Sequence, residues 1–381
     1  MKKILLIFLA ILLAGCAAAP QPTEPVTEPT TIPVTVPPTE PPTEPPTDPP
    51  DPIAEAVEVM TVKEKIGQLF LARYDSVNAL EHTQTYHLGG WLLFAPDFEG
   101  ETPDSIRSEI SALQAVSDVP LLIGVDEEGG TVTRVSRYSA FRSSKFPSPR
   151  SLYNKGGIDM VLETEAEKSE LLASLGINVN LAPVCDITTD SGAFMYSRSL
   201  GLSPEKTGKV VAGMVETMAD HGVASVLKHF PGYGNNADTH VGIARDKRSL
   251  EELENNDLVP FQAGFDAGCG AVLVSHTIVE CLDLKLPASL SPAVIGYIRE
   301  EMGFDGVIVT DDLVMQAITD QYGAGEAAVM AIEAGCDLLC STEYVKQYNA
   351  VLSAVEEGRI DQEMLDAAVY RILRWKQSFS Q

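Results

Sequence analysis

Short runs of continuously apolar residues recur along the chain from about residue 69 onward, separated by longer stretches with helical spacing. Runs of this length that do not alternate with polar residues predict strands buried on both faces, as in a parallel sheet covered by helices. We expect eight such strands, at Leu69–Ala72, Gly90–Phe94, Leu121–Val125, Val179–Ala182, Ala224–Leu227, Ala271–Val274, Val307–Val309 and Asp337–Leu339.

The stretches between these runs are amphipathic, and several begin with Ser or Asp, residues that cap helix N-termini. Strands that alternate with helices indicate an α/β fold. Eight such units favour a closed (β/α)8 TIM-type barrel over an open doubly wound sheet, and no Gly-x-Gly-x-x-Gly follows the first expected strand. The expected helices are Asp104–Val116, Asp159–Leu175, Ser203–His221, Ser249–Ala267, Ser291–Met302, Gly323–Ala334 and Asp361–Ser378.

The chain begins MKKILLIFLAILLAGC, with two lysines before an apolar run too short to span a membrane comfortably. This pattern predicts a secretory signal peptide over residues 1–16. Its ending, Leu-Ala-Gly-Cys, resembles a bacterial lipobox, which implies cleavage before Cys16 and lipid attachment to the Cys16 thiol. An ordinary signal peptide with a chance cysteine is the alternative interpretation.

Residues 17–53 repeat Thr, Pro and Glu, with six acids and no Lys or Arg. Such a segment cannot bury enough apolar surface to fold, so we expect a disordered tether. Residues 54–381 then form one folded domain, held by the lipid on the outer surface of a bacterial cell. The long tether suits a Gram-positive surface better than a periplasm.

The composition excludes some partners and leaves others open. A net charge of −27 argues against nucleic acid, whose binding depends on Lys and Arg. Five cysteines remain besides Cys16, an odd number without a Cys-x-x-Cys pair. This count disfavours a disulfide framework or a zinc ribbon, although one or two bridges remain open. We interpret these cysteines mostly as small core residues and expect a monomer.

Polar side chains follow the expected strands at their carboxyl ends. In a barrel all of these ends surround one mouth, where barrel enzymes have their active sites. The residues concerned are Asp126, Asp186, Lys228, His229, Ser275, His276, Asp311 and Asp312.

Asp311 is the first of the two acids that end the buried run GVIVTDD, where a carboxylate suits a nucleophile, a base or a metal ligand. The alternative, which applies more to Asp312 or Thr310, is a cap on the following helix. No spacing of the His-Glu-x-x-His kind accompanies these acids, so we expect neither a metal nor another cofactor.

Residues 228–240 read KHFPGYGNNADTH, and the glycines, proline and asparagines in this stretch indicate a loop. His240 follows Asp238 by two residues, so the carboxylate can orient the imidazole and stabilise its positive charge. An imidazole paired in this way can donate a proton near neutral pH. A general acid together with a strand-end carboxylate suggests the cleavage of an acetal. A polar surface loop is the alternative.

Six motifs in order resemble the family 3 glycoside hydrolases, and more narrowly their β-N-acetylglucosaminidase branch. The resemblance extends from MTVKEKIGQLF at 60–70 to AIEAGCDLLC at 331–340. The motifs are VDEEGGTVTRV (125–135), LAPVCDI (181–187), SRSLG (197–201), KHFPGYG with the following Asp-Thr-His (228–240), LPASLSP (286–292) and GVIVTDDLVM (306–315).

The resemblance implies a role for each matching residue. Asp311 matches the nucleophile, which forms a covalent glycosyl intermediate with retention, and Asp238 with His240 matches an acid/base dyad. The implied substrate is terminal, non-reducing β-linked GlcNAc in muropeptides or chitin-type oligosaccharides. For Arg134 and Arg198 a structural ion pair is the alternative. The implied sugar-binding residues are Asp126, Arg134, Arg198, Lys228, His229 and, less directly, Asp186.

The chain departs from the family pattern in one loop. Tyr233 stands where His is common, and the segment from Gly234 to Asp238 is one residue shorter than typical. Three other interpretations remain open: a β-glucosidase or β-xylosidase, a phosphorylase in which phosphate replaces water, and an inactive tethered glycan-binding protein. Intact Asp311, Asp238 and His240 argue against the last.

Overall fold

The computed structural model of the chain describes residues 51–234 and 244–379. The expected signal peptide with Cys16, the tether up to residue 50, and the pair Asp238 and His240 lie outside the described residues. Helix α1 (Pro52–Val59) begins two residues before the boundary that we expected, because Asp51 caps it and Pro52 occupies its first position. Asp51 also accepts a 2.8 Å hydrogen bond from Tyr370 near the end of the chain.

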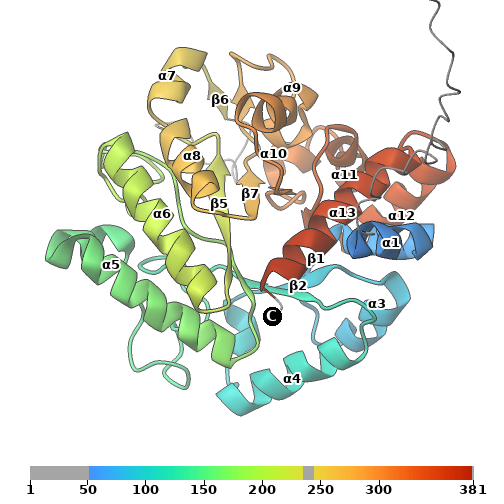
Figure 1. Cartoon of the computed structure of the whole chain (residues 1–381), viewed down its shortest axis with the longest axis horizontal. Coiled ribbons are helices and arrows are strands. Elements are labelled where there is room, and N and C mark those ends of the chain that lie inside the picture. Colours follow the sequence, from blue (N-terminus) through green and yellow to red (C-terminus); the bar gives the residue numbers. More distant parts are fainter. Residues whose placement is uncertain (1–50, 235–243, 380–381) are drawn as a thin grey trace, which may run out of the picture. The chain divides into compact units, whose positions relative to one another are not determined.

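Eight parallel strands form one sheet, and all eight expected strands are present (Figure 1). Their order in the sheet is β10-β1-β2-β3-β4-β5-β7-β9. Their bounds are β1 (Phe70–Arg73), β2 (Gly90–Leu93), β3 (Leu122–Val125), β4 (Val179–Asn180), β5 (Ala224–Phe230), β7 (Ala271–Val274), β9 (Val307–Thr310) and β10 (Leu339–Ser341).

The sheet closes on itself between its two end strands. The N–H of Leu338, just before β10, donates to the carbonyl of Ile308 on β9 at 3.1 Å, and the N–H of Thr310 donates to the carbonyl of Leu338 at 3.0 Å. β10 pairs in parallel with β1 on its other side. The prediction of a (β/α)8 barrel is therefore confirmed, and an open doubly wound sheet is not what the chain forms.

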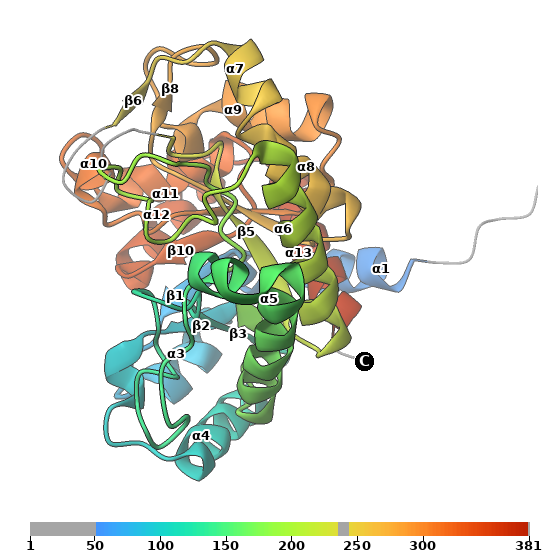
Figure 2. The ribbon, with the colours of Figure 1, turned by 90° about the vertical axis from the view of Figure 1, so that its left-hand side faces the viewer.

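Helices surround the barrel on its outside (Figures 1 and 2). A separate two-stranded parallel sheet pairs β6 (Arg245–Asp246) with β8 (Ile278–Val279). After α1, the helices are α2 (Val62–Gln68), α3 (Ala79–Tyr86), α4 (Pro103–Ala115), α5 (Pro149–Ser174), α6 (Pro204–Asp220), α7 (Leu250–Asn255), α8 (Leu258–Asp266), α9 (Pro292–Gly296), α10 (Gln316–Thr319), α11 (Ala324–Glu333), α12 (Tyr344–Glu356) and α13 (Gln362–Phe379).

Two expected helices differ from the structure in ways that local chemistry explains. The range 249–267 is divided into α7 and α8, because in a continuous helix the ring of Pro260 would clash with the carbonyl of Asn256. Helix α5 begins ten residues before the expected start at Asp159, but it is interrupted at Gly157, whose φ is 69°. Only the part after this glycine has the spacing that predicted the helix.

The core lies inside the barrel and between the barrel and its helices. The residues of β2, β3, β7 and β9 are all buried, which is why these strands are continuous apolar runs rather than alternating ones. Four of the five domain cysteines are buried and none forms a disulfide, so the core interpretation is confirmed except for the exposed Cys281.

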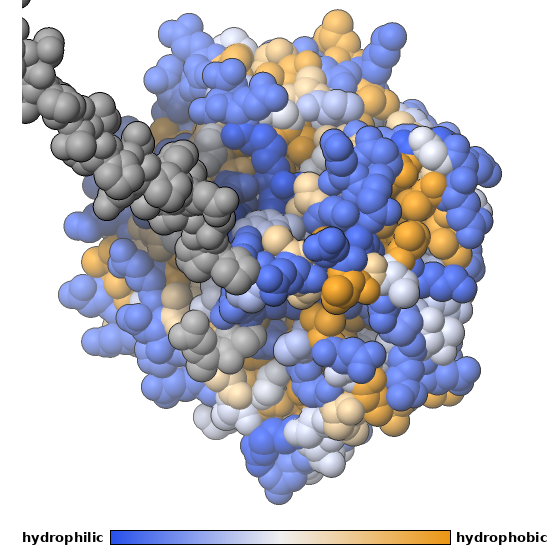
Figure 3. Space-filling view, turned by 45° about the vertical axis from the view of Figure 1, so that its right-hand side comes forward, coloured by the Kyte–Doolittle hydropathy of each residue, from blue (hydrophilic) through white to orange (hydrophobic). Residues whose placement is uncertain are grey.

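The surface in Figure 3 is mainly hydrophilic, with apolar side chains in separate patches. Four large hydrophobic side chains of the described residues are exposed: Val59, Val77, Leu80 and Leu284. Among the described helices, none has the length and hydropathy that crossing a membrane would require.

Candidate active site

The carboxyl ends of the strands surround a cavity of about 250 Å3. Strand ends far apart in the sequence meet here because the barrel brings all of them to one mouth. Six residues predicted for the site contribute to its walls: Asp126, Arg134, Arg198, Lys228, His229 and Asp311. The remaining wall is formed by Val132, Leu181, Tyr233 and Leu273.

Lys228 extends from β5 toward two acids that follow β3. Its Nζ pairs with Oδ1 of Asp126 and lies 2.6 Å from Oε1 of Glu128. The lysine side chain is 2% exposed, so its charge depends on these two carboxylates rather than on water. The amine and the Asp126 carboxylate both border the cavity, where they can bind sugar hydroxyls.

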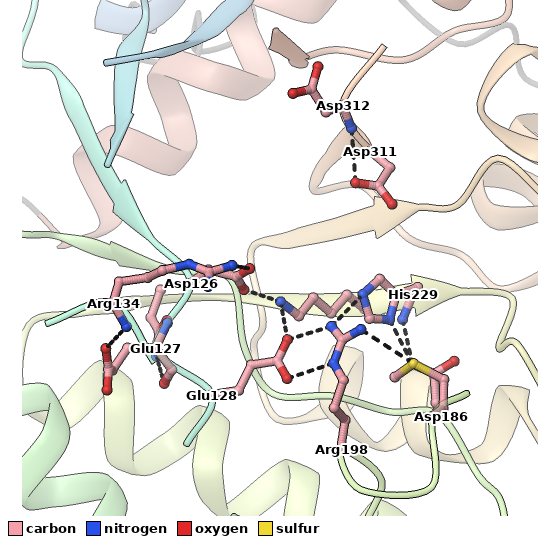
Figure 4. Close-up of polar contacts among 12 residues, drawn as sticks. Asp126, Glu127, Glu128, Arg134, Asp186, Arg198, His229, Asp311 and Asp312 are labelled. Atoms are coloured by element: carbon pink, nitrogen blue, oxygen red, sulfur yellow. Dashed lines mark hydrogen bonds and ion pairs between the residues drawn. The ribbon is translucent and has the colours of Figure 1, made fainter. Parts of the chain in front are cut away.

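Glu128 forms the centre of the charged network in Figure 4. Its Oε1 and Oε2 accept hydrogen bonds of 2.6 and 2.9 Å from Nη2 and Nε of Arg198, a two-point pairing. Burial opposes ionisation of Glu128, but the positive charges of Lys228 and Arg198 outweigh it and lower its pKa to about 2. Glu128 therefore stays ionised and fixes both cations at the cavity wall.

His229 lies between Arg198 and a buried acid. Its Nδ1 is 2.8 Å from Oδ2 of Asp186, and its Nε2 is 3.1 Å from Nη2 of Arg198. Because a guanidinium can only donate, Nε2 accepts this hydrogen bond and Nδ1 carries the proton that Asp186 accepts. The imidazole is thus held in one tautomer and one orientation.

Asp186 lies behind His229 and does not border the cavity. Its carboxylate also accepts hydrogen bonds from the N–H groups of His229 at 3.2 Å and Tyr233 at 2.7 Å. Burial would raise the pKa of Asp186, but the facing imidazole and these hydrogen bonds hold it below its ordinary value. Asp186 therefore supports His229 rather than contacting a ligand in the cavity directly.

Arg134 borders the cavity and is fixed at both ends. Nη2 of its guanidinium pairs with Oδ2 of Asp126 at 3.0 Å, and its backbone N–H donates to Oε2 of Glu127 at 2.6 Å. Glu127 is fully buried and also accepts from the N–H of Val135 at 2.7 Å. The structural ion pairs considered for Arg134 and Arg198 are present, and both side chains border the cavity as well.

Asp311 follows β9 and borders the cavity. It is not part of the charged network around Glu128 (Figure 4). Its backbone N–H donates to the carbonyl of Val274 at 3.0 Å, which fixes the end of β9 against β7. Its Oδ1 accepts a 2.9 Å hydrogen bond from the N–H of Asp312. A carboxylate held by one oxygen at the rim of a cavity can attack an electrophilic carbon.

The Asp312 side chain does not border the cavity. Its carboxylate accepts from the hydroxyl of Thr342 at 2.5 Å and from the N–H groups of Thr342 and Val314 at 3.3 and 3.2 Å. Burial raises the pKa of Asp312, and the hydrogen bond from Thr342 opposes this shift. Asp312 therefore joins the turn after β9 to the end of β10, rather than capping α10.

Sequence reasoning missed Glu127 and Glu128, although both belong to the VDEEGG motif. Three consecutive acids after a buried strand were the available signal, and only the first was selected. Tyr233, the departure from the family pattern, is buried and packs edge-on against His229 with ring centroids 5.3 Å apart. Asp238 and His240 lie in the undescribed range 235–243, so their predicted roles stay predictions.

Comparisons with known proteins identify the family of the chain. Residues 61–375 match the family described as Glycosyl hydrolase family 3 N terminal domain. The β-hexosaminidase LpqI of Mycobacterium tuberculosis is 31% identical over 331 residues, which cover 84% of this chain and 83% of that protein. A β-hexosaminidase of Alkalilimnicola ehrlichii is 33% identical over 276 residues, covering 70% and 76%.

Solved structures are similar over the same region. A family 3 β-N-acetylglucosaminidase from Paenibacillus sp. FPU-7 aligns with a TM-score of 0.79 and 36% identity over 84% of this chain, which spans 63% of that longer chain. The structure of M. tuberculosis LpqI aligns with a TM-score of 0.78 and 29% identity, covering 85% of this chain and 96% of LpqI. On this evidence the chain belongs to glycosyl hydrolase family 3 and is a glycoside hydrolase.

Proposed function

We propose that the protein is an exo-acting β-N-acetylglucosaminidase that removes terminal, non-reducing β-linked GlcNAc with retention of configuration. The observation that carries this proposal is the position of Asp311, which faces a small cavity whose other charged walls are Asp126, Lys228, Arg198 and Arg134. The names of its relatives, β-hexosaminidase and β-N-acetylglucosaminidase, support the choice of GlcNAc as the sugar.

In the first chemical step, Oδ2 of Asp311 attacks the anomeric carbon and forms a covalent glycosyl ester. The bond from this carbon to the leaving oxygen breaks, and His240 gives that oxygen its proton, with Asp238 stabilising the imidazolium. In the second step, His240 takes a proton from water, the resulting hydroxide oxygen bonds to the anomeric carbon, and Asp311 is released. Two inversions give net retention.

The fixed charges of the cavity wall hold the sugar while this happens. Lys228, Arg198 and Arg134 donate to sugar oxygens, and Asp126 accepts from hydroxyl groups. Glu128 already orients Lys228 and Arg198, and Asp186 orients His229, so little reorganisation is needed when the sugar binds. Charges that are already oriented in this way stabilise the transition state better than water would.

The size of the cavity supports exo action. Its volume of about 250 Å3 lies below the roughly 300–1,000 Å3 of pockets that hold drug-sized ligands, so it suits one sugar unit. We further propose a lipid anchor at Cys16 and a tether over residues 17–50, which would hold the enzyme on the outer cell surface as a monomer. Muropeptides or related glycans outside the membrane are then the natural substrates.

The test uses nitrophenyl β-GlcNAc and nitrophenyl β-glucoside, with and without phosphate, on the wild type and on Asp311→Asn. Asp159→Asn, a change at an exposed acid on α5, is the matched control. The proposal requires nitrophenol release from the GlcNAc substrate in the wild type and the control but not in Asp311→Asn. Preference for the glucoside, or phosphate-dependent formation of a sugar 1-phosphate, would overturn the assignment.

A further inference from the structure

His276 is a buried histidine at the carboxyl end of β7 that the mechanism above does not use. The side chain has no solvent exposure. Its Nδ1 lies 2.7 Å from the hydroxyl oxygen of Ser289, and its Nε2 lies 3.0 Å from the backbone carbonyl oxygen of Asp312. Both partners are distant in sequence, so His276 joins β7 to two separate segments of the barrel mouth.

The partner at each ring nitrogen determines where the proton lies. A carbonyl oxygen only accepts hydrogen bonds, so Nε2 of His276 must carry a hydrogen. In the neutral ring Nδ1 then accepts from the hydroxyl of Ser289. Ser289 is itself buried, and its N–H donates to the carbonyl of Ser275 at 3.2 Å. The Asp312 carbonyl therefore selects the tautomer, and the Ser289 hydroxyl fixes the orientation of the ring.

The side chain of Asp312 is held in place as well. Its carboxylate accepts from Thr342 and Val314, as described above, while its carbonyl accepts from His276. Between these two attachments the N–H of Asp312 donates to Oδ1 of Asp311 at 2.9 Å. The direction of this N–H therefore depends on the contacts that fix the rest of Asp312.

We propose that His276, oriented by Ser289, is a positioning residue for the nucleophile Asp311 and acts through the backbone of Asp312. This inference rests on the proposed role of Asp311. With Oδ1 held by the N–H of Asp312, Oδ2 is the oxygen directed at the anomeric carbon. A displacement of about 1 Å in such a group lowers rates by as much as about 100-fold.

Two substitutions separate this role from simple packing. His276→Gln keeps an amide N–H near the position of Nε2, and therefore keeps a donor for the Asp312 carbonyl. His276→Asn is shorter and leaves a polar group only near the position of Nδ1, facing Ser289. The control is His221→Asn, at a partly exposed histidine that follows α6 and contacts Thr217 and Glu170 away from the cavity.

The experiment measures kcat and KM on nitrophenyl β-GlcNAc, the rate of covalent labelling by an activated 5-fluoro GlcNAc glycoside, and the unfolding midpoint of every variant. We expect His276→Asn to lower kcat and the labelling rate about 30-fold with KM changed less than threefold. His276→Gln should recover most of both rates, and His221→Asn should match the wild type.

Equal losses in the Gln and Asn variants, or losses that follow the unfolding midpoint alone, would overturn the proposal. A change in KM alone would also overturn it, because His276 would then affect substrate binding in the ground state and not the reactivity of Asp311. Failure of the proposed function looks different: the wild type itself would neither hydrolyse the GlcNAc substrate nor become labelled.

Discussion

The guanidinium of Arg198 binds the carboxylate of Glu128 at two points, with N–O distances of 2.6 and 2.9 Å, at the wall of the barrel mouth. The same carboxylate accepts from Lys228. One buried acid thus holds two of the three cations that we assign to sugar binding. A buried ion network adds little stability as a whole, but losing one member leaves the others uncompensated.

Glu128→Gln should therefore destabilise the fold and weaken sugar binding together. We expect a loss of about 3–5 kcal/mol in the free energy of unfolding, because Lys228 and Arg198 keep their charges without this carboxylate. Chemical denaturation measures the change. Glu163→Gln, at an exposed position on α5, is the control and should stay within about 0.5 kcal/mol of the wild type. A Glu128→Gln variant as stable as this control would contradict the network described here.

The low pKa of Glu128 also predicts how stability changes with pH. The value falls from 4.5 to about 2 in the folded protein, so the unfolded chain binds the proton more tightly. This contribution is present above about pH 4.5 and is lost as the pH falls to about 2, with an upper limit of about 3 kcal/mol. The stability difference between the wild type and Glu128→Gln should shrink over this window. A difference that is constant from pH 6 to pH 2 would refute the assignment.

Arg248→Met should destabilise the described segments on either side of the range 235–243. Arg248 pairs with two buried acids, Asp246 at 2.5 Å and Asp257 at 2.6 Å, and donates to the carbonyl of Gly232 at 2.9 Å. Without it both carboxylates lose their cation, and we expect a loss of about 3–5 kcal/mol. Arg248→Lys should recover only part of this, because an ammonium cannot reproduce the forked contacts. Full recovery by lysine in a denaturation experiment would argue against this geometry.

Lys376→Met should stabilise the protein at neutral pH. Burial lowers the pKa of Lys376 from 10.5 to about 7, so the unfolded chain binds more protons between these values and wild-type stability rises with pH across that range. Methionine removes this dependence, but Gln68 loses a 2.7 Å hydrogen bond. We expect a net gain of about 2 kcal/mol at pH 7, which shrinks toward pH 10. Unfolding curves at the two pH values test this, and a less stable variant at pH 7 would contradict it.

Most of the fold could be predicted because a barrel strand is buried on both faces and is therefore a continuous apolar run. The strand at Gly90–Leu93 and its counterparts stand out for this reason. Helix α2, which is seven residues long, and helix α3 were not among the expected helices. Helix α12 was not expected either, and its N-cap, Glu343, makes no side-chain capping bond. Its first residues therefore carry no local signal of the kind that marks α6, where Ser203 accepts from Lys206.

The site could be predicted only as far as strand ends determine it. The rule that barrel strands end at one mouth located Asp126, Lys228, His229 and Asp311. It could not tell Asp126, which borders the cavity, from Glu128, whose contacts are with Lys228 and Arg198 from other segments. The role of His276 could not be predicted either, because its hydrogen bond to Asp312 forms only when β7 and β9 lie side by side.

The most direct test of Asp311 as the nucleophile is to identify the residue that forms the covalent intermediate. The purified wild type would be incubated with an activated 5-fluoro GlcNAc glycoside, digested, and mapped by mass spectrometry. We expect one added 5-fluoro GlcNAc unit per chain, on the peptide at Asp311, and none in Asp311→Asn. A label on any other residue, or turnover of nitrophenyl β-GlcNAc by an enzyme that is never labelled, would contradict the assignment of Asp311 as the nucleophile.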